Sequence, residues 1–190
     1  MDYFLIDGMP AKVLNVNIAI TSYSKLLDSA SGVNEFTISF ITPTMLRSPQ
    51  YYIKVVRRGD RHIPVVRRKE RRRVVYLPIP QPNLLFKSVL RQFRKFSGIE
   101  SFPYENVLAF IESDGIILKG FPRGIRTKVV RPSPDEYYIG FVGDVAFGLE
   151  DESSKSIARY IGVLLKYCEY CGVGAGRTAG LGWVKVRVAS

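Results

Sequence analysis

A glycine-rich segment near the carboxyl terminus constrains this chain more than any other feature. Residues 172–182 read GVGAGRTAGLG and lie between a predicted helix and a predicted final strand. Because glycine has no Cβ, such a segment can adopt positive φ angles and let another backbone approach closely. With Arg177 and Thr178 at its centre, we interpret the segment as a cradle of backbone N–H groups for phosphate. A flexible turn that closes a sheet is the alternative interpretation.

Two better-known glycine signatures do not fit the spacing. A P-loop, G-x-x-x-x-G-K-[ST], would need a glycine where Cys171 stands and a lysine where Arg177 stands. A dinucleotide-binding fingerprint, G-x-G-x-x-G, joins a strand to a helix, whereas this segment is predicted to join a helix to a strand. Both nucleotide-binding motifs are therefore excluded.

Charge and composition point to an anionic partner. The chain has 190 residues, enough for one sizeable domain or two small ones, and 46% of them are hydrophobic. Twenty-eight Lys and Arg oppose 17 Asp and Glu, which gives a formal charge of +11 and favours nucleic acid as the partner. No run of eighteen apolar residues is present, and the opening residues 1–7 lack the basic start of a secretory signal. We expect a cytoplasmic protein without membrane insertion.

The two cysteines form a single C-x-x-C pair. Cys168 and Cys171 have no second pair, and the one histidine of the chain, His62, is distant in sequence. Four soft ligands for zinc cannot be assembled from this set, so we expect no metal and no cofactor. The spacing instead favours two small side chains packed on one face near the end of a helix.

The pattern of the first half predicts a strand, an insertion and a helix. Residues 34–42 alternate apolar and polar, as in a half-buried strand, and Pro43 is expected to stop it. Asn83 is a predicted N-cap for a helix over residues 84–96. The expected inward stripe of that helix consists of Leu85, Val89, Phe93 and Phe96.

The second half of the sequence predicts further strands and one more helix. Residues 107–112 and 116–119 are predicted as strand, with a turn at Asp114–Gly115 and a continuation towards residues 126–130. A second hairpin arm is expected over residues 137–147, then a helix capped by Ser153 and Ser154, then a strand over 183–188 with one apolar and one cationic face. The order is that of an α+β, ferredoxin-like (β-α-β-β-α-β) domain, RRM-like in layout. We expect this domain to span residues 34–190, preceded by an extension or domain remnant at residues 1–33.

The most basic stretch lies within the predicted insertion. Apolar residues interleave with its cations, which favours an ordered β-hairpin over a solvated charged surface. Such a ribbon could follow a phosphate backbone, with Tyr51 and Tyr52 available for stacking on unpaired bases. The cations that we expect to bind are Arg57, Arg58, Arg61, Arg67, Arg68, Arg71, Arg72 and Arg73. From the glycine-rich segment we add Gly172, Gly174, Gly176, Arg177, Thr178, Gly180 and Gly182.

Three pieces of the sequence, in order, resemble a known family. They are residues 40–44 (FITPT), 140–145 (GFVGDV) and 172–184 (GVGAGRTAGLGWV). Together they are similar to the CRISPR endoribonucleases of the RAMP superfamily that process repeat RNA, the sixth Cas family. The resemblance implies two ferredoxin-like domains in tandem, of which this chain carries the second. It also implies CRISPR repeat RNA (pre-crRNA) as a partner, together with other Cas proteins.

The resemblance further implies metal-independent cleavage. In that reaction a ribose 2′-OH attacks the adjacent phosphate and leaves a 2′,3′-cyclic phosphate, which calls for a base, an acid and positive charge. The family's usual histidine base belongs to the first domain, so no residue here inherits it by motif. His62 is a candidate base, with Lys54 and Tyr51 as candidate partners by proximity in sequence. Two alternatives are a non-catalytic RNA-binding subunit of an effector complex and an unrelated ferredoxin-like module that binds nucleic acid.

Overall fold

The computed structural model describes residues 3–6, 9–12, 18–48, 51–58, 61–68, 75–133, 136–150 and 155–188, with the backbone alone in β1, β2, β5 and β6. No helix in these ranges is both long and apolar enough to cross a lipid bilayer. The elements are β1 (Tyr3–Ile6), β2 (Met9–Lys12), α1 (Tyr23–Ser29), β3 (Glu35–Thr44), β4 (Leu46–Ser48), β5 (Tyr51–Arg58), β6 (Arg61–Arg68), β7 (Val75–Leu77), α2 (Pro82–Ser97), α3 (Tyr104–Glu112), β8 (Ile116–Gly120), β9 (Ile125–Ser133), β10 (Glu136–Leu149), α4 (Lys155–Cys171) and β11 (Val184–Val188).

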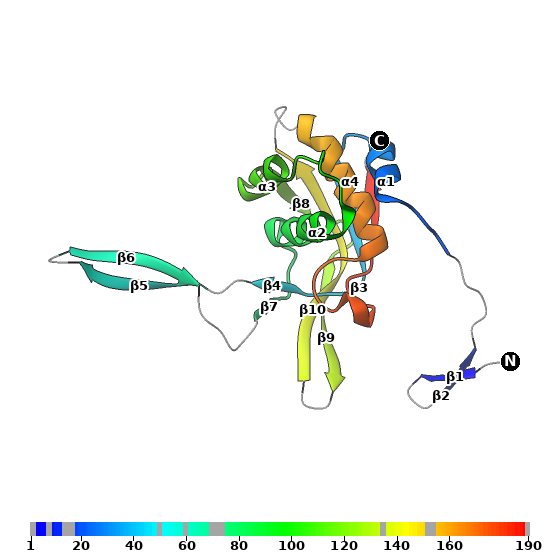
Figure 1. Cartoon of the computed structure of the whole chain (residues 1–190). Coiled ribbons are helices and arrows are strands. Elements are labelled where there is room, and N and C mark those ends of the chain that lie inside the picture. The colour runs from blue at the N-terminus through cyan, green and yellow to red at the C-terminus, as the bar shows by residue number, and fades with distance from the viewer. Residues whose placement is uncertain are drawn as a thin grey trace.

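An antiparallel sheet organises the body of the molecule. Its strands lie in the order β11-β3-β10-β8, and β9 pairs with the outer half of β10. With α2 and α3 between β3 and β8, and α4 between β10 and β11, the chain follows the β-α-β-β-α-β order of a ferredoxin-like domain. The predicted α+β fold class is confirmed. In Figure 1 the helices α2, α3 and α4 cover one face of the sheet.

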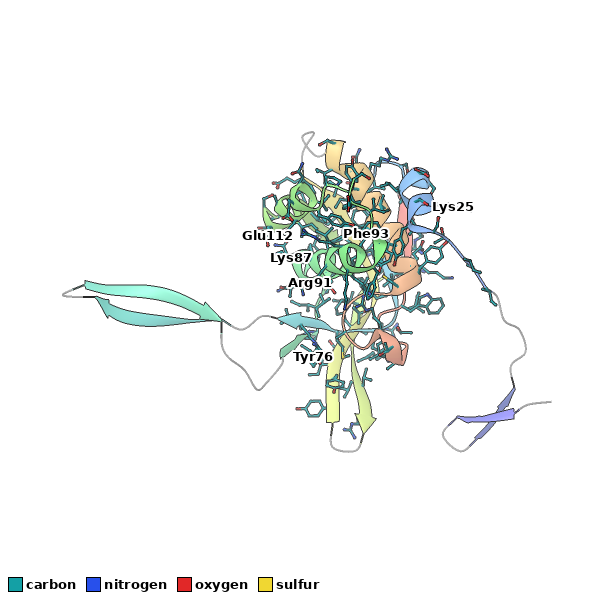
Figure 2. The ribbon with its side chains drawn as sticks, viewed as in Figure 1. Lys25, Tyr76, Lys87, Arg91, Phe93 and Glu112 are labelled. Carbon is teal, nitrogen blue, oxygen red and sulfur yellow. The ribbon has the colours of Figure 1, made fainter. Side chains whose placement is uncertain are left out.

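The core lies between this sheet and its helices. Phe36, Ile38 and Phe40 of β3 are buried, as their alternation predicts, and the Phe36 ring packs 5.6 Å from that of Phe147 on β10. Phe93 of α2 is fully buried at the centre of the helical layer (Figure 2). The short helix α1 also joins this core, because Leu26 is buried and α1 packs on α4.

Residues 107–112 form helix α3, so the strand predicted there is wrong. The run Val107–Ile111 is apolar throughout, and a run of that length does not distinguish a strand from a buried helix. Pro103 stands at the N-cap, and Val107 and Ile111 lie one turn apart, both buried. The helical conformation of this segment is therefore stabilised by its packing on α2 and α4.

Three finer predictions are also corrected. Helix α2 begins at Pro82 with Gln81 as the N-cap, because proline suits the first helical turn, and the Asn83 side chain instead donates to Asp114. Phe96 is exposed in the last turn of α2, which ends at Ser97 before the C-cap Gly98. Pro43 does not stop β3, which runs on to Thr44. The predicted caps Ser153 and Ser154 lie outside the described residues.

Candidate nucleic-acid interface

The glycine-rich loop, residues 172–183, connects α4 to β11 and is bonded to the end of β3. The Gly182 N–H donates to the Pro43 carbonyl at 3.1 Å, and the Ala175 N–H donates to the Met45 carbonyl at 2.9 Å. The Trp183 N–H donates to Thr42 Oγ1 at 2.9 Å. The loop is therefore an ordered extension of the sheet, not a flexible connection.

Its glycines serve two different purposes. Gly174 and Gly182 have positive φ angles, and a Cβ on either would strike a backbone carbonyl, that of Met45 or of Val173. These two positions require glycine for close packing. Gly180 also has a positive φ of 76°, but no atom lies within 4 Å of the position that its Cβ would take. The loop is thus tightly packed at its base and open at its tip.

The tip presents backbone N–H donors. Residues 176–180 are exposed apart from the half-buried Arg177, and residues 177–179 form one 3-10 turn. The N–H groups of Ala179, Gly180 and Leu181 donate back into the loop, to Gly176 or Arg177. Those of Gly176, Arg177 and Thr178 have no acceptor among the described residues. Three successive free N–H groups form the kind of donor set that binds a phosphate oxygen.

The side chain of Arg177 lies back towards the base of the loop, where its Cγ is close to Gly172 and its charge acts on Cys171. This side chain is half-buried, and its Nη1 is buried without a hydrogen-bond partner among the described residues. A buried donor without a partner is costly, and an anion would pair with it only after the Arg177 side chain turned outwards. The predicted phosphate-binding residues of the loop therefore lie together, with Gly172, Gly174 and Gly182 shaping the base and residues 176–180 forming the tip.

The two cysteines lie at the end of α4, just before the glycine-rich loop. The Cys168 Sγ donates to the Leu165 carbonyl at 2.9 Å, and the Cys171 Sγ donates to the Gly172 carbonyl at 3.1 Å. Burial raises the pKa of the Cys171 thiol to about 11, although the charge of Arg177 acts in the opposite direction. Both thiols are free, and the described residues contain no group of His, Cys, Asp and Glu that could hold a metal ion.

Met45 joins the three sequence pieces that carry the family resemblance. This buried residue follows β3, forms a bridge with Ala175 of the loop and lies beside Gly140 of β10. A Cβ on Gly140 would come within 2.9 Å of the Thr44 carbonyl oxygen and 3.2 Å of Met45 Cγ. The three pieces, far apart in sequence, therefore meet at one place.

A second β-ribbon leaves the body at this meeting point. Strands β9 and β10 pair from Gly143 to Glu136 and project beyond the sheet (Figure 1). Arg126, Lys128 and Arg131 of β9 are exposed and have no ion-pair partner among the described residues. Tyr76 of β7 packs against Tyr138 of β10 at 5.1 Å where the ribbon leaves the body (Figure 2). We call this ribbon the β9–β10 arm.

The sequence predicted strand towards residues 126–130 and a hairpin arm over residues 137–147, but the cations of β9 were not among the predicted binding residues. The signal for them was present in residues 126–131 (RTKVVR), where cations recur every second or third position next to a proline-containing turn. Because side chains two apart in a strand share a face, Arg126 and Lys128 lie on the same side of the arm. The arm and the loop tip together place cations and free N–H groups at one end of the molecule.

The basic insertion forms a separate hairpin, as predicted. Strands β5 and β6 pair only with each other, and Figure 1 shows them extending away from the body. His62 lies opposite Arg57, near the hairpin turn. Lys54 and Tyr51 lie three and six positions further along β5 from Arg57, about 10 and 20 Å at the usual rise of a strand. The backbone therefore does not bring these three residues side by side.

The predicted binding cations of the insertion divide into two groups. Five arginines lie in β5 and β6, whereas three others fall outside the described residues. The first group is Arg57, Arg58, Arg61, Arg67 and Arg68, and the second is Arg71, Arg72 and Arg73.

Comparison with known proteins gives a family match and several similar structures. A family model described as "CRISPR-associated endoribonuclease Cas6" matches residues 38–184. The structure is similar to that of Thermus thermophilus Cas6 (TTHB231), with a TM-score of 0.66 and 23% identity over 88% of this chain and 58% of that one. No curated protein matches the sequence.

The structures of two Cas6 product complexes are also similar to this one. One, of Cas6 (TTHB231), has a TM-score of 0.68 and 24% identity over 88% of this chain and 56% of that chain. The other, of Cas6 (TTHA0078), has a TM-score of 0.61 and 23% identity over 90% of this chain and 57% of that chain. At these identities the likeness shows a shared fold, and the present chain spans a little over half the length of these proteins.

Proposed function

Since the chain belongs to the CRISPR-associated endoribonuclease Cas6 family, we propose that it is a cytoplasmic protein that binds CRISPR repeat RNA and processes it. The similar structures include Cas6 product complexes and a Cas6-RT-Cas1–Cas2 complex, which suits RNA and other Cas proteins as partners. The family match removes the alternative of an unrelated ferredoxin-like module.

One observation carries the binding half of the proposal. Three free N–H groups, at Gly176, Arg177 and Thr178, lie in an exposed loop. The base of this loop and the β9–β10 arm both contact Met45. Backbone donors and arginines both bind phosphate oxygens without reading the bases. The loop tip would thus hold the backbone at one point, and Arg126 and Lys128 would follow it along the arm.

The basic hairpin would extend this surface. Its arginines contribute much of the formal charge of +11, and a β-ribbon of this kind can follow an RNA backbone. Both ribbons leave the body separately, so an RNA held by the loop could be reached from two sides (Figure 1).

Cleavage would proceed by attack of a 2′-OH on its neighbouring phosphate. The phosphorane that forms carries extra negative charge, which the free N–H groups and Arg177 would stabilise. His62 is the candidate base, and Lys54 and Tyr51 are candidate partners. Because the backbone separates these three along the hairpin, each is proposed to act on the RNA individually and not as a preassembled set.

A non-catalytic RNA-binding subunit is the second candidate. It is favoured because His62, the one histidine of the sequence, lies on strand β6 of the hairpin and not beside the glycine-rich loop. In this alternative the loop and the arm bind the repeat RNA, and another chain supplies the catalytic groups.

Incubation with labelled repeat RNA in excess EDTA tests the proposal. We expect binding at moderate salt and a product that ends in a 2′,3′-cyclic phosphate, and RNA with a 2′-deoxy sugar at the cleaved position should bind without being cut. Loss of cleavage in His62→Ala with unchanged binding would support His62 as the base. Binding without cleavage would favour the subunit alternative, and no binding would refute both.

A further inference from the structure

The face of the sheet that the helices leave uncovered has its own arrangement of charge. Antiparallel register places Asp144, Ser39 and Lys185 in one row across β10, β3 and β11. Ala146, Thr37 and Arg187 form the next row. The rows between them, such as Val145, Ile38 and Val186, face the helices. The open face therefore has small or polar residues at its centre and cations on its edge strand.

Asp144 fixes two arginines on this face. Its side chain is 7% exposed, and its Oδ2 accepts hydrogen bonds from Arg123 Nε and, at 2.9 Å, from Arg187 Nη2. The arginine side chains remain 67% and 56% exposed. Since a guanidinium carries five N–H donors, each arginine keeps most of its donors directed to solvent. Burial alone would raise the pKa of Asp144, but the hydrogen bonds from the arginines outweigh it, and the pKa lies below its ordinary value.

The same face is continuous with the glycine-rich loop. Trp183 follows Gly182 directly, is 49% exposed, and has Lys185 Nζ 5.9 Å from its ring centroid. Trp183, Lys185 and Arg187 recur every second residue, so they line one side of β11 at intervals of about 6.7 Å. An aromatic ring and two cations therefore lead from the loop across the open face to Asp144.

From this arrangement we propose that the open face, formed by Trp183, Lys185, Arg187 and Arg123 over Asp144, binds a single-stranded segment of RNA next to the part held by the loop. The inference rests on the proposed function and adds a second contact surface to it. An exposed aromatic ring beside a row of cations is the usual means of binding unpaired nucleotides. A protein partner is less suited, because the cores of protein interfaces are depleted of Lys and other charged residues. Asp144 acts here as a positioning residue.

Binding of fluorescently labelled repeat RNA, measured over a range of salt concentrations, tests the inference. Trp183→Ala should weaken binding about tenfold through loss of stacking. Lys185→Ala and Arg187→Ala should each lower the slope of log affinity against log salt by about 0.7, as expected for one lost phosphate contact on a single strand. The matched control is Lys25→Ala on α1, which removes the same charge from the helical side (Figure 2) and should leave the slope unchanged.

Asp144→Asn separates positioning from simple attraction. The substitution removes one negative charge from the protein, so general attraction alone predicts tighter RNA binding. Positioning predicts weaker binding, because a neutral amide holds the two guanidinium groups less firmly than the carboxylate does. The melting temperature of the Asp144→Asn variant is measured alongside. If this variant does not fold, the variants of the exposed residues Trp183, Lys185 and Arg187 still decide the test.

The outcomes distinguish this inference from the proposed function. If the wild-type protein binds no repeat RNA, both are overturned. If Arg177→Ala weakens binding while the Trp183, Lys185 and Arg187 variants behave like Lys25→Ala, the glycine-rich loop stands and the open face does not bind RNA. Weakening by both sets supports the continuous path.

Discussion

Two glycines of the loop offer a direct test of its packing. Gly180 and Gly182 have nearly the same positive φ, 76° and 74°, so an alanine at either position pays a similar backbone strain of about 1–2 kcal/mol. Restricting the unfolded chain offsets this by about 0.4–1 kcal/mol. Gly180→Ala should therefore lower the free energy of unfolding by about 1 kcal/mol, since nothing lies near its Cβ.

Gly182→Ala should cost considerably more. Its Cβ would overlap the carbonyl oxygen of Val173, and relief of that contact would break the bonds from Val173 N–H to the Gly182 carbonyl and from Gly182 N–H to Pro43. At about 1 kcal/mol for each hydrogen bond, the total loss is about 3 kcal/mol. In a chain of this size the two variants should melt about 3 °C and about 9 °C below the wild type.

Thermal and urea unfolding of the two variants measure this difference. Equal destabilisation by the two alanines would show that the base of the loop is not packed as described, and that its glycines are merely flexible.

Three further predictions follow from the described side chains. Arg126→Ala and Lys128→Ala on the arm should each reduce the salt dependence of RNA binding, and unchanged slopes would remove the arm from the interface. The lowered pKa of Asp144 means that its charged form stabilises the fold above the unfolded value of about 3.9 and that this contribution is lost as the pH falls through the folded pKa. The difference in unfolding free energy between wild type and Asp144→Asn should therefore shrink on acidification, and a constant difference would contradict the assignment. Cys171, with a raised pKa, should react slowly with iodoacetamide at neutral pH, and EDTA should leave the melting temperature unchanged; rapid labelling or a chelator effect would indicate a reactive or metal-binding pair.

The sequence predicted the sheet well because its strands carry a clear period. In β3 the alternation of Phe36, Ile38 and Phe40 corresponds to the observed buried face, and β11 has the predicted cationic side in Lys185 and Arg187. These strands are covered on one face only, and such strands alternate strictly. Their order along the chain was enough to identify the ferredoxin-like arrangement.

Prediction failed where local pattern and tertiary packing compete. Residues 107–111 are apolar throughout, so only contact with α2 and α4 shows that they are helical. Strand towards residues 126–130 and a hairpin arm over 137–147 were predicted, but the pairing of residues 125–133 with 136–143, which groups the cations of the β9–β10 arm, is not visible in one strand alone. The role of Asp144 was equally hidden, since Arg123 and Arg187 meet it from positions 21 and 43 residues away.

The most direct test of the account is an NMR titration of the ¹⁵N-labelled protein with repeat RNA that carries a 2′-deoxy sugar and cannot be cleaved. The backbone amide signals of Gly176, Arg177 and Thr178 should shift most strongly and saturate together with RNA binding, because their N–H groups are free to donate to phosphate. Saturation of RNA binding with these three amides unshifted would contradict the claim that the glycine-rich loop holds the RNA backbone.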